Sequence, residues 1–198
     1  AQLLADAIAA ARKVDAVVFI GGLNKGDHQD SEGADRLQLG LPYGQDAVIG
    51  ALAEANPNLA VAIVSGNAVA MPWIDRVSAV LEAWYSGSEA GNALADVLFG
   101  AVNPSGKLPF TFPVRLEDCS AHSAGEYPGD GQVVYRDGIF VGYRWIEKER
   151  IEPLFAFGHG LSYTTFDIAN VQADRTSLAT TGRLRVSADV TNTGGRAG

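Results

Sequence analysis

The sequence predicts an α/β domain, a mostly parallel sheet sandwiched by helices, followed by the first strands of an incomplete β-sandwich. Two patterns lead to this class. Short apolar, β-branched segments alternate with segments of helical periodicity, and the connections between them are short. Near the C-terminus this pattern changes to strict alternation of apolar and polar residues. The composition agrees, since 47% of the residues are hydrophobic and 19% are charged, which is typical of a packed core.

The α/β part begins with a predicted helix over residues 2–13, where apolar side chains recur at helical spacing. The run AVVFIGG at 16–22 has the length and composition of a strand that is buried on both faces. A second helix and a second buried strand follow at 45–56 and 59–66, separated by the helix-ending dipeptide PN. This order predicts a parallel sheet with helices on both faces.

Four further segments continue the α/β part. MPWIDR at 71–76 predicts a short turn or helix, and SAVLEAWY at 78–85 predicts a third strand. SEAGNALADVLFG at 88–100 predicts a helix, because a serine lies near its start and a glycine at its end. LPFTFP at 108–113 predicts a short edge strand, since proline cannot donate a hydrogen bond to a neighbouring strand.

The pattern changes after residue 113. Residues 114–137 are polar and contain glycines, GIFVGYRWI at 138–146 predicts a strand, and PLFAFGHGLSYTTF at 153–166 predicts an interdomain connector. GRLRVSADVTNTGG at 182–195 alternates strictly, which indicates a half-exposed antiparallel strand of an all-β domain.

We therefore assign residues 1–160 to the α/β domain. Residues 161–198 are assigned to a linker and the truncated start of the β-sandwich, because they are too few to complete a sandwich of about 100 residues.

Charge and composition exclude several partners. The net charge is −8 and no basic residues cluster, so we expect no nucleic-acid partner. No apolar run approaches the roughly 20 residues needed to cross a bilayer, so no membrane span is expected. The single cysteine, Cys119, cannot form an intrachain disulfide, and the sequence has no Cys/His spacing for zinc. We expect neither a metal nor a cofactor.

The charged segment KGDHQDSEGADR, here called the charged loop (residues 25–36), is the strongest candidate site. It follows the first predicted strand and contains Asp27, Asp30, Glu32 and Asp35. Ligands of open α/β sheets bind outside the carboxyl ends of the strands, where the segments SGNAVAMPW and YSGSEAGN are also expected. The sequence therefore predicts a ligand site that includes this loop.

Glu32 is the candidate proton donor of the loop. Neighbouring carboxylates and partial burial raise the pKa of a carboxyl, which can then protonate a leaving oxygen. Asp35 and Arg36 can pair with each other or with nearby groups and hold the loop in place. A solvated surface loop is the alternative, and the calcium-loop spacing is absent. Trp73 and Trp84 are better explained as core or domain-contact residues than as sugar platforms, although a stacking role for one of them stays open.

Several segments together resemble the second half of glycoside hydrolase family 3, of the β-glucosidase type. They are SEGADR with LPYGQDAVI, SGNAVAMPW, AWYSGSEAGNALADVLFGAVNPSGKLPFTFP, DGIFVGYRW, PLFAFGHGLSYTTF and VTNTGGRAG. They occur in the order of the family and cover nearly the whole chain.

The resemblance implies a (β/α)-barrel domain before this chain, then the α/β sandwich and a fibronectin type III-like domain. It implies a retaining exo-β-glucosidase that acts on β-glucosides or oligosaccharides. Glu32 would be the general acid/base, and the nucleophilic aspartate would belong to the absent barrel, so the fragment alone is expected to be inactive. Asp30 and His28 are expected to line the outer subsite.

Two other functions stay open at this stage. One is a β-xylosidase or another exo-β-glycosidase on the same scaffold, although DSEGADR resembles the glucosidase branch more closely. The other is a non-catalytic α/β module that binds a carbohydrate or a nucleotide. The segment around residues 23–37 also resembles bacterial extracytoplasmic members, which implies a secreted or periplasmic protein, with a cytoplasmic location as the alternative.

Overall fold

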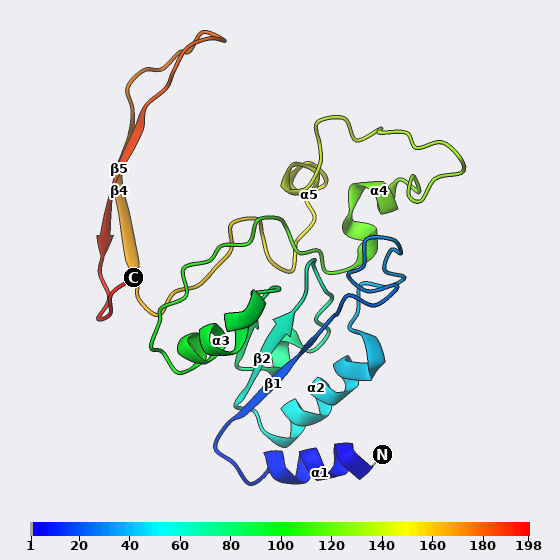
Figure 1. Ribbon diagram of the computed structural model, residues 1–198. Helices are drawn as coiled ribbons and strands as arrows, with labels where there is room; N and C mark the ends of the chain where they lie inside the picture. The colour runs from blue at the N-terminus through cyan, green and yellow to red at the C-terminus, as the bar shows by residue number, and fades with distance from the viewer. Residues whose placement is uncertain (1) are drawn as a thin grey trace. The chain divides into compact units, whose positions relative to one another are not determined.

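The computed structural model describes residues 2–198 (Figure 1). The contacts divide the chain into two compact units. The first combines Ala1–Ala90 with Leu108–His159, and the second combines Gly91–Lys107 with Gly160–Gly198. The domain boundary that we assign near residue 160 stays a prediction.

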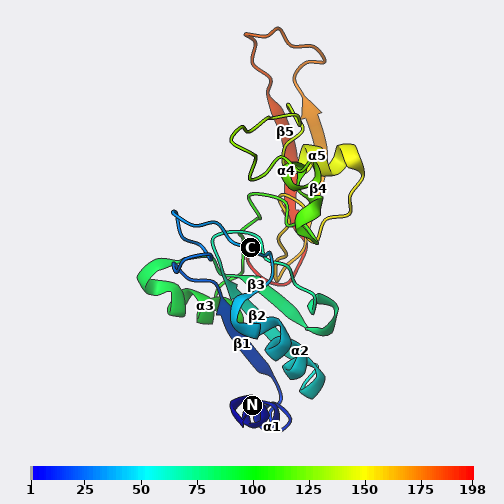
Figure 2. The ribbon, with the colours of Figure 1, turned by 90° about the vertical axis from the view of Figure 1, so that its right-hand side faces the viewer.

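The first unit is built on a parallel sheet of three strands in the order β1, β2, β3. The strands are β1 (Val17–Gly22), β2 (Leu59–Val64) and β3 (Ala79–Glu82) (Figure 2). β2 is the central strand, and its residues Leu59, Val61, Ala62 and Ile63 are at most 1% exposed. The parallel α/β class predicted from the sequence is confirmed.

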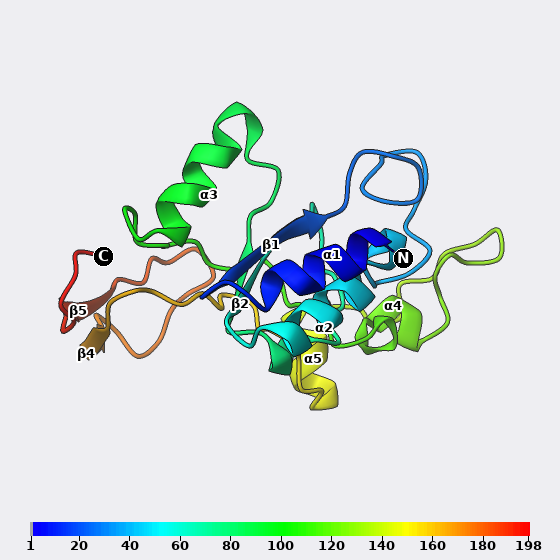
Figure 3. The same cartoon turned by 90° about the horizontal axis from the view of Figure 1, so that it is seen from below.

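Helices α1 (Gln2–Ala11) and α2 (Gln45–Ala55) run beside the sheet (Figure 3). α2 contacts β1 and β2, and α1 contacts α2. The buried Asn56 ends α2 and donates hydrogen bonds from Nδ2 to the carbonyl oxygens of Ala11 and Val14, both at 2.9 Å. This amide therefore ties the ends of the two helices together.

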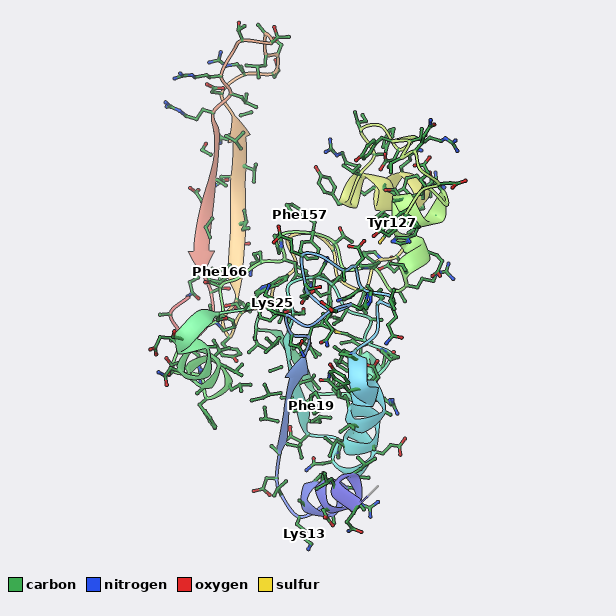
Figure 4. All side chains as sticks on the ribbon, turned by 45° about the vertical axis from the view of Figure 1, so that its right-hand side comes forward. Lys13, Phe19, Lys25, Tyr127, Phe157 and Phe166 are labelled. Atoms are coloured by element: carbon green, nitrogen blue, oxygen red, sulfur yellow. The ribbon has the colours of Figure 1, made fainter. Side chains whose placement is uncertain are left out.

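Strand β1 differs from its prediction in burial. Val18 and Ile20 are 48% and 58% exposed, whereas Val17 packs against the core. Phe19, labelled in Figure 4, also packs against the core. Among the described residues β1 pairs only with β2, so it is an edge strand with one covered face. The expectation that it is buried on both faces is wrong, because a short apolar run does not distinguish an edge from a central strand.

Aromatic side chains complete the core. Trp73 is fully buried, and its Nε1 donates a hydrogen bond to Asp46 Oδ1 at 2.8 Å. Trp84 packs edge-on against Phe110 and Phe112, whose rings stack on each other. The core assignment of Trp73 is thus confirmed, and this residue has no surface on which a sugar could stack.

Residues 108–113 do not form the predicted edge strand. They form a single antiparallel bridge, between Phe112 and Phe155. Pro109 and Pro113 lack the amide hydrogens that a longer ladder needs.

The strand predicted over residues 138–146 is also wrong. The segment contains the start of a helix, α5 (Tyr143–Glu149), which ends at Arg150 in the left-handed conformation. Gly138 and Gly142 both have a φ of +59°, and such positive values interrupt an extended run.

The second unit contains most of helix α3 (Ala90–Leu98) and the antiparallel hairpin β4 (Phe166–Ala173) and β5 (Val186–Asn192). The alternating segment is therefore a strand, as predicted, but both of its faces are exposed rather than one. Within this unit, Tyr163 donates a hydrogen bond from its hydroxyl to the carbonyl oxygen of Val97 at 2.8 Å.

The remaining helical turns are short. They are α4 (Ser120–Ser123) and the 3-10 turns η1 (Pro42–Gly44), η2 (Ile74–Arg76), η3 (Gly87–Glu89) and η4 (Leu116–Asp118). Within residues 2–198, none of the helices has both the length and the apolar character that a membrane crossing requires.

Candidate functional site

The loops that follow β1, β2 and β3 meet at the carboxyl edge of the sheet, as the parallel topology predicts. Asp30 from the charged loop joins them. Its Oδ2 accepts hydrogen bonds from the amide of Gly66, at 2.7 Å, and from the hydroxyl of Tyr85, at 2.8 Å. Gly66 follows β2 and Tyr85 follows β3, so one carboxylate oxygen connects all three loops.

A polar cavity of about 280 Å³ lies beside this junction. It is lined by Lys25, Gln29, Asp30, Ser31, Asp35, Arg36, Gly66 and Asn67. Most of these residues belong to the charged loop, and the others follow β2. The cavity is therefore a property of the loops and not of the apolar core.

Glu32 is exposed to solvent, and it is not among the residues that line the cavity, although its neighbour Ser31 is. None of the described residues donates a hydrogen bond to its carboxylate. In the chain around Glu32, Ser31 Oγ donates a hydrogen bond to the carbonyl oxygen of Ala34 at 3.1 Å, which closes a tight turn. A Cβ atom added to Gly33 would meet no other atom within 4 Å, so the space beside Glu32 is open.

The chain after Glu32 is anchored as well. Arg36 Nη2 donates a hydrogen bond to the carbonyl oxygen of Ala68 at 2.6 Å, and burial lowers the pKa of this guanidinium although Asp30 and Tyr85 oppose the shift. The Asp35 carboxylate accepts a hydrogen bond from the hydroxyl of Tyr127. Asp35 and Arg36 thus pair with neighbouring groups rather than with each other, and they hold the loop at two points.

The two residues expected to line the outer subsite occupy different places. Asp30 lines the cavity and uses one oxygen for the junction, whereas His28 is not among the lining residues. His28 Nδ1 lies 3.0 Å from the carbonyl oxygen of Asp35. Because a carbonyl can only accept, Nδ1 carries the proton in this contact. Its Nε2 is left as the nitrogen that a ligand could contact.

Sequence reasoning missed Tyr85 and Lys25 as site residues. Lys25 Nζ lies 4.6 Å from the centroid of the Tyr85 ring, a cation–π distance. The available signal was positional: both residues belong to loops that leave the carboxyl ends of predicted strands.

Glu82 is a third residue that the sequence analysis did not single out. Its Oε1 lies 3.2 Å from Ser65 Oγ and 3.2 Å from the amide of Trp84, and its Oε2 is buried without a partner among the described residues. Desolvation raises the pKa of Glu82 to about 7, and the hydrogen bonds from Trp84 and Ser65 only partly oppose this shift. The single Ser65 proton also has a closer acceptor, the carbonyl oxygen of Asn67 at 2.8 Å. A protonated Oε1 of Glu82 can donate to Ser65 Oγ, which leaves the Ser65 proton free for the carbonyl oxygen of Asn67.

Glu82 therefore makes stability depend on pH. The carboxyl has an ordinary pKa of 4.5 in the unfolded chain and a pKa of about 7 in the folded protein. Between these values the folded protein retains a proton that the unfolded chain has released, so the free energy of unfolding decreases as pH rises. We expect Glu82→Gln, which mimics the neutral acid, to gain up to about 3 kcal/mol over the parent between pH 4.5 and pH 8.

Urea unfolding of the parent chain and the variant at these two pH values measures the gain. Glu54→Gln is a suitable control, because the Glu54 side chain is 76% exposed and its ion pair with Arg76 contributes little. A difference between Glu82→Gln and the parent that does not change with pH would contradict the assignment.

No group of three or more His, Cys, Asp or Glu side chains within residues 2–198 is arranged to hold a metal ion.

The fold and the site together define a parallel α/β domain that presents an anchored acidic loop at the carboxyl ends of its strands. Residues 1–163 match the glycosyl hydrolase family 3 C-terminal domain. The chain therefore belongs to glycosyl hydrolase family 3, as the sequence motifs indicated.

Sequence similarity to individual proteins supports this assignment. The chain is 50% identical to the beta-glucosidase BoGH3A of Bacteroides ovatus over 98% of its length, which is 26% of that relative. It is 45% identical to the thermostable beta-glucosidase B of Acetivibrio thermocellus, over 100% of its length and 26% of that relative. The chain thus spans about a quarter of the length of these relatives.

Solved structures agree as well. The beta-glucosidase DesR of Streptomyces venezuelae, determined with D-glucose, superposes with a TM-score of 0.88 at 42% identity. The match covers 96% of this chain and 24% of that structure. A beta-glucosidase of Bifidobacterium adolescentis superposes with a TM-score of 0.88 at 38% identity, covering 98% of this chain and 28% of that structure.

Proposed function

We propose that this chain is the acid/base-bearing part of a retaining exo-β-glucosidase, which removes terminal non-reducing β-D-glucosyl residues. Glu32 is the general acid/base of the reaction. The attacking carboxylate is supplied by a region outside these 198 residues, a (β/α)-barrel domain in the family that the chain resembles. The complete enzyme is secreted or periplasmic.

The observation that carries the proposal is the position of Glu32. Its side chain is exposed, its neighbour Ser31 lines the polar cavity, and the chain on either side of it is anchored through Asp30 and Arg36. A proton donor must reach a substrate oxygen and must be held in place to do so. The relatives named beta-glucosidases support the reaction class.

The chemistry follows from a pair of carboxyl groups. In the first step Glu32 donates its proton to the glycosidic oxygen while the partner carboxylate attacks the anomeric carbon, which releases the aglycone alcohol and leaves a glucosyl ester. In the second step Glu32, now a carboxylate, takes a proton from water as the water oxygen displaces the ester. Retention requires the two carboxyl groups to lie about 5–5.5 Å apart. Glu32 therefore has to extend from its own domain toward the partner region, which explains an exposed residue on a long loop.

Asp30 and His28 contribute to the outer subsite in this proposal. Asp30 lines the cavity, and only its Oδ2 takes part in the three-loop junction, while His28 offers Nε2. Both groups can accept hydrogen bonds from the hydroxyl groups of a leaving sugar.

The proposal is tested by the substrate range and the product of the complete enzyme. With matched p-nitrophenyl glycosides we expect kcat/KM for the β-glucoside to exceed that for the β-xyloside by about tenfold or more, because a pocket shaped for the extra hydroxymethyl group gains contacts from it. Proton NMR should detect β-glucose as the first product, since two displacements retain the configuration.

A preference for the xyloside would instead favour the second candidate, a β-xylosidase. The first appearance of α-glucose would contradict the retaining mechanism. Sugar binding without turnover would favour a non-catalytic carbohydrate-binding module.

A further inference from the structure

The charged loop depends on Asp30 for its attachment to the sheet. Asp30 precedes Glu32 by two residues, and its Oδ2 accepts the hydrogen bonds from Gly66 and Tyr85 described above. The amide of Asp30 donates to the carbonyl oxygen of Asn24 at 3.0 Å, which closes the beginning of the loop on itself. The side chain of Asp30 is thus the link between the chain just before Glu32 and the ends of β2 and β3.

Tyr85 is the side-chain donor of this link. The hydroxyl faces Asp30, and Lys25 lies over the ring, so the charged loop contacts both the edge and the face of this tyrosine. Partial burial and the hydrogen bond to Asp30 raise the pKa of Tyr85, which keeps the phenol in its donating form.

The fit at the junction is tight. A Cβ atom added to Gly66 would lie 3.2 Å from Tyr85 Cε2 and 3.4 Å from Asp30 Oδ2. The backbone of Gly66 therefore approaches both side chains closely. This geometry fixes the position of Asp30 between the ends of two strands.

We propose that Tyr85 is a positioning residue for the acid/base loop, which acts through Asp30 to hold Glu32 at the glycosidic oxygen. This inference rests on the proposed function of Glu32. Tyr85 itself transfers no proton. Its loss lets the chain before Glu32 move, while Arg36 still anchors the chain that follows.

The kinetic consequence is selective. Proton donation by Glu32 requires hydrogen-bond distance to the leaving oxygen, whereas attack by the partner carboxylate does not involve this loop. A poor leaving group, such as an alkyl alcohol, needs the proton, and a 2,4-dinitrophenolate does not. Loosening the loop should therefore slow the reaction of alkyl glucosides and leave the reaction of the dinitrophenyl glucoside almost unchanged.

The test uses Tyr85→Phe in the complete enzyme, because phenylalanine keeps the ring under Lys25 and removes only the hydroxyl. We expect kcat/KM for an alkyl β-glucoside to fall about tenfold, the typical effect of losing one hydrogen bond to a charged group. The value for 2,4-dinitrophenyl β-glucoside should change less than about twofold. Tyr163→Phe is the matched control, because it also removes a tyrosine hydroxyl that donates a hydrogen bond, here to the carbonyl oxygen of Val97 in the second unit. It should change kcat/KM for neither substrate.

Asp30→Asn provides a second route if Tyr85→Phe folds poorly, as judged by its thermal midpoint. It should show the same selectivity, and the double variant should lose less than the sum of the two single changes, because both act on one hydrogen bond. Equal losses on both substrates, no loss on either, or full additivity would overturn the proposal.

Glu32→Ala in the same assays separates the two claims. If Glu32→Ala is selective for the alkyl glucoside and Tyr85→Phe is not, only the positioning role is wrong. If Glu32→Ala is itself unselective, the acid role fails, and the positioning role fails with it.

Discussion

Glu32→Ala in the complete enzyme is expected to reduce kcat/KM for an alkyl β-glucoside by about 10²–10⁴-fold, the usual contribution of a positioned general acid. The alcohol would then have to leave as an alkoxide, which is a far poorer leaving group than the neutral alcohol. The exposed carboxylate has no hydrogen-bond donor among the described residues, so its removal leaves no buried group unpaired. The loss should therefore appear in the chemistry rather than in folding.

The same variant should behave differently with 2,4-dinitrophenyl β-glucoside. This aglycone leaves without a proton, so kcat/KM should stay close to the parent value. Because hydrolysis of the glucosyl ester still needs Glu32 as a base, kcat and KM should fall together as the ester accumulates. Added azide, an anion that needs no base, should restore turnover and yield β-glucosyl azide.

Asp27→Ala is the matched control for Glu32. Asp27 is, like Glu32, an exposed carboxylate on the same loop, but neither of its sequence neighbours lines the cavity, whereas Ser31 beside Glu32 does. Its removal should change kcat/KM for both substrates less than about twofold. Equal losses on the two substrates after Glu32→Ala, or a failure of azide to restore turnover, would contradict the acid/base role.

The sequence was sufficient for the elements whose periodicity is strong. The spacing in residues 2–13 and 45–56 predicted α1 and α2, and the short apolar runs predicted β1 and β2. It was insufficient where local conformation decides the outcome. Residues 138–146 have the composition of a strand, but the backbone of Gly142 turns the chain into α5.

For the candidate site, the order of strands and loops in the sequence predicted the location, but it did not predict the contacts. The rule for parallel sheets predicted that the three loops meet, and family motifs singled out Glu32. The hydrogen bond between Tyr85 and Asp30 forms because Tyr85 follows a strand whose end lies near the charged loop. Glu82 is partly buried because the strand register places it opposite Ile63. Asp30 and Tyr85 are 55 positions apart, and no local sequence pattern predicts a hydrogen bond between them. The structure is needed to find it.

The isolated 198-residue chain is expected to hydrolyse aryl β-glucosides at least about 10⁴-fold more slowly than the complete enzyme. Protonation of a glycosidic oxygen by Glu32 does not replace the carboxylate that attacks the anomeric carbon and stabilises its positive charge. Assays at millimolar p-nitrophenyl β-glucoside, with the complete enzyme as reference, measure this difference.

The decisive comparison is between the isolated chain and its own Glu32→Ala variant. If the attacking carboxylate belongs to another region, the two should have the same background rate, and intrinsic fluorescence should report an equally buried Trp73 in both. Mixing the parent chain with the separately produced remainder of the enzyme should restore turnover, and mixing the Glu32→Ala chain should not restore it for an alkyl glucoside. Steady turnover by the isolated parent chain, well above its variant, would mean that these 198 residues contain both carboxyl groups and that the division of the active site between two regions is wrong.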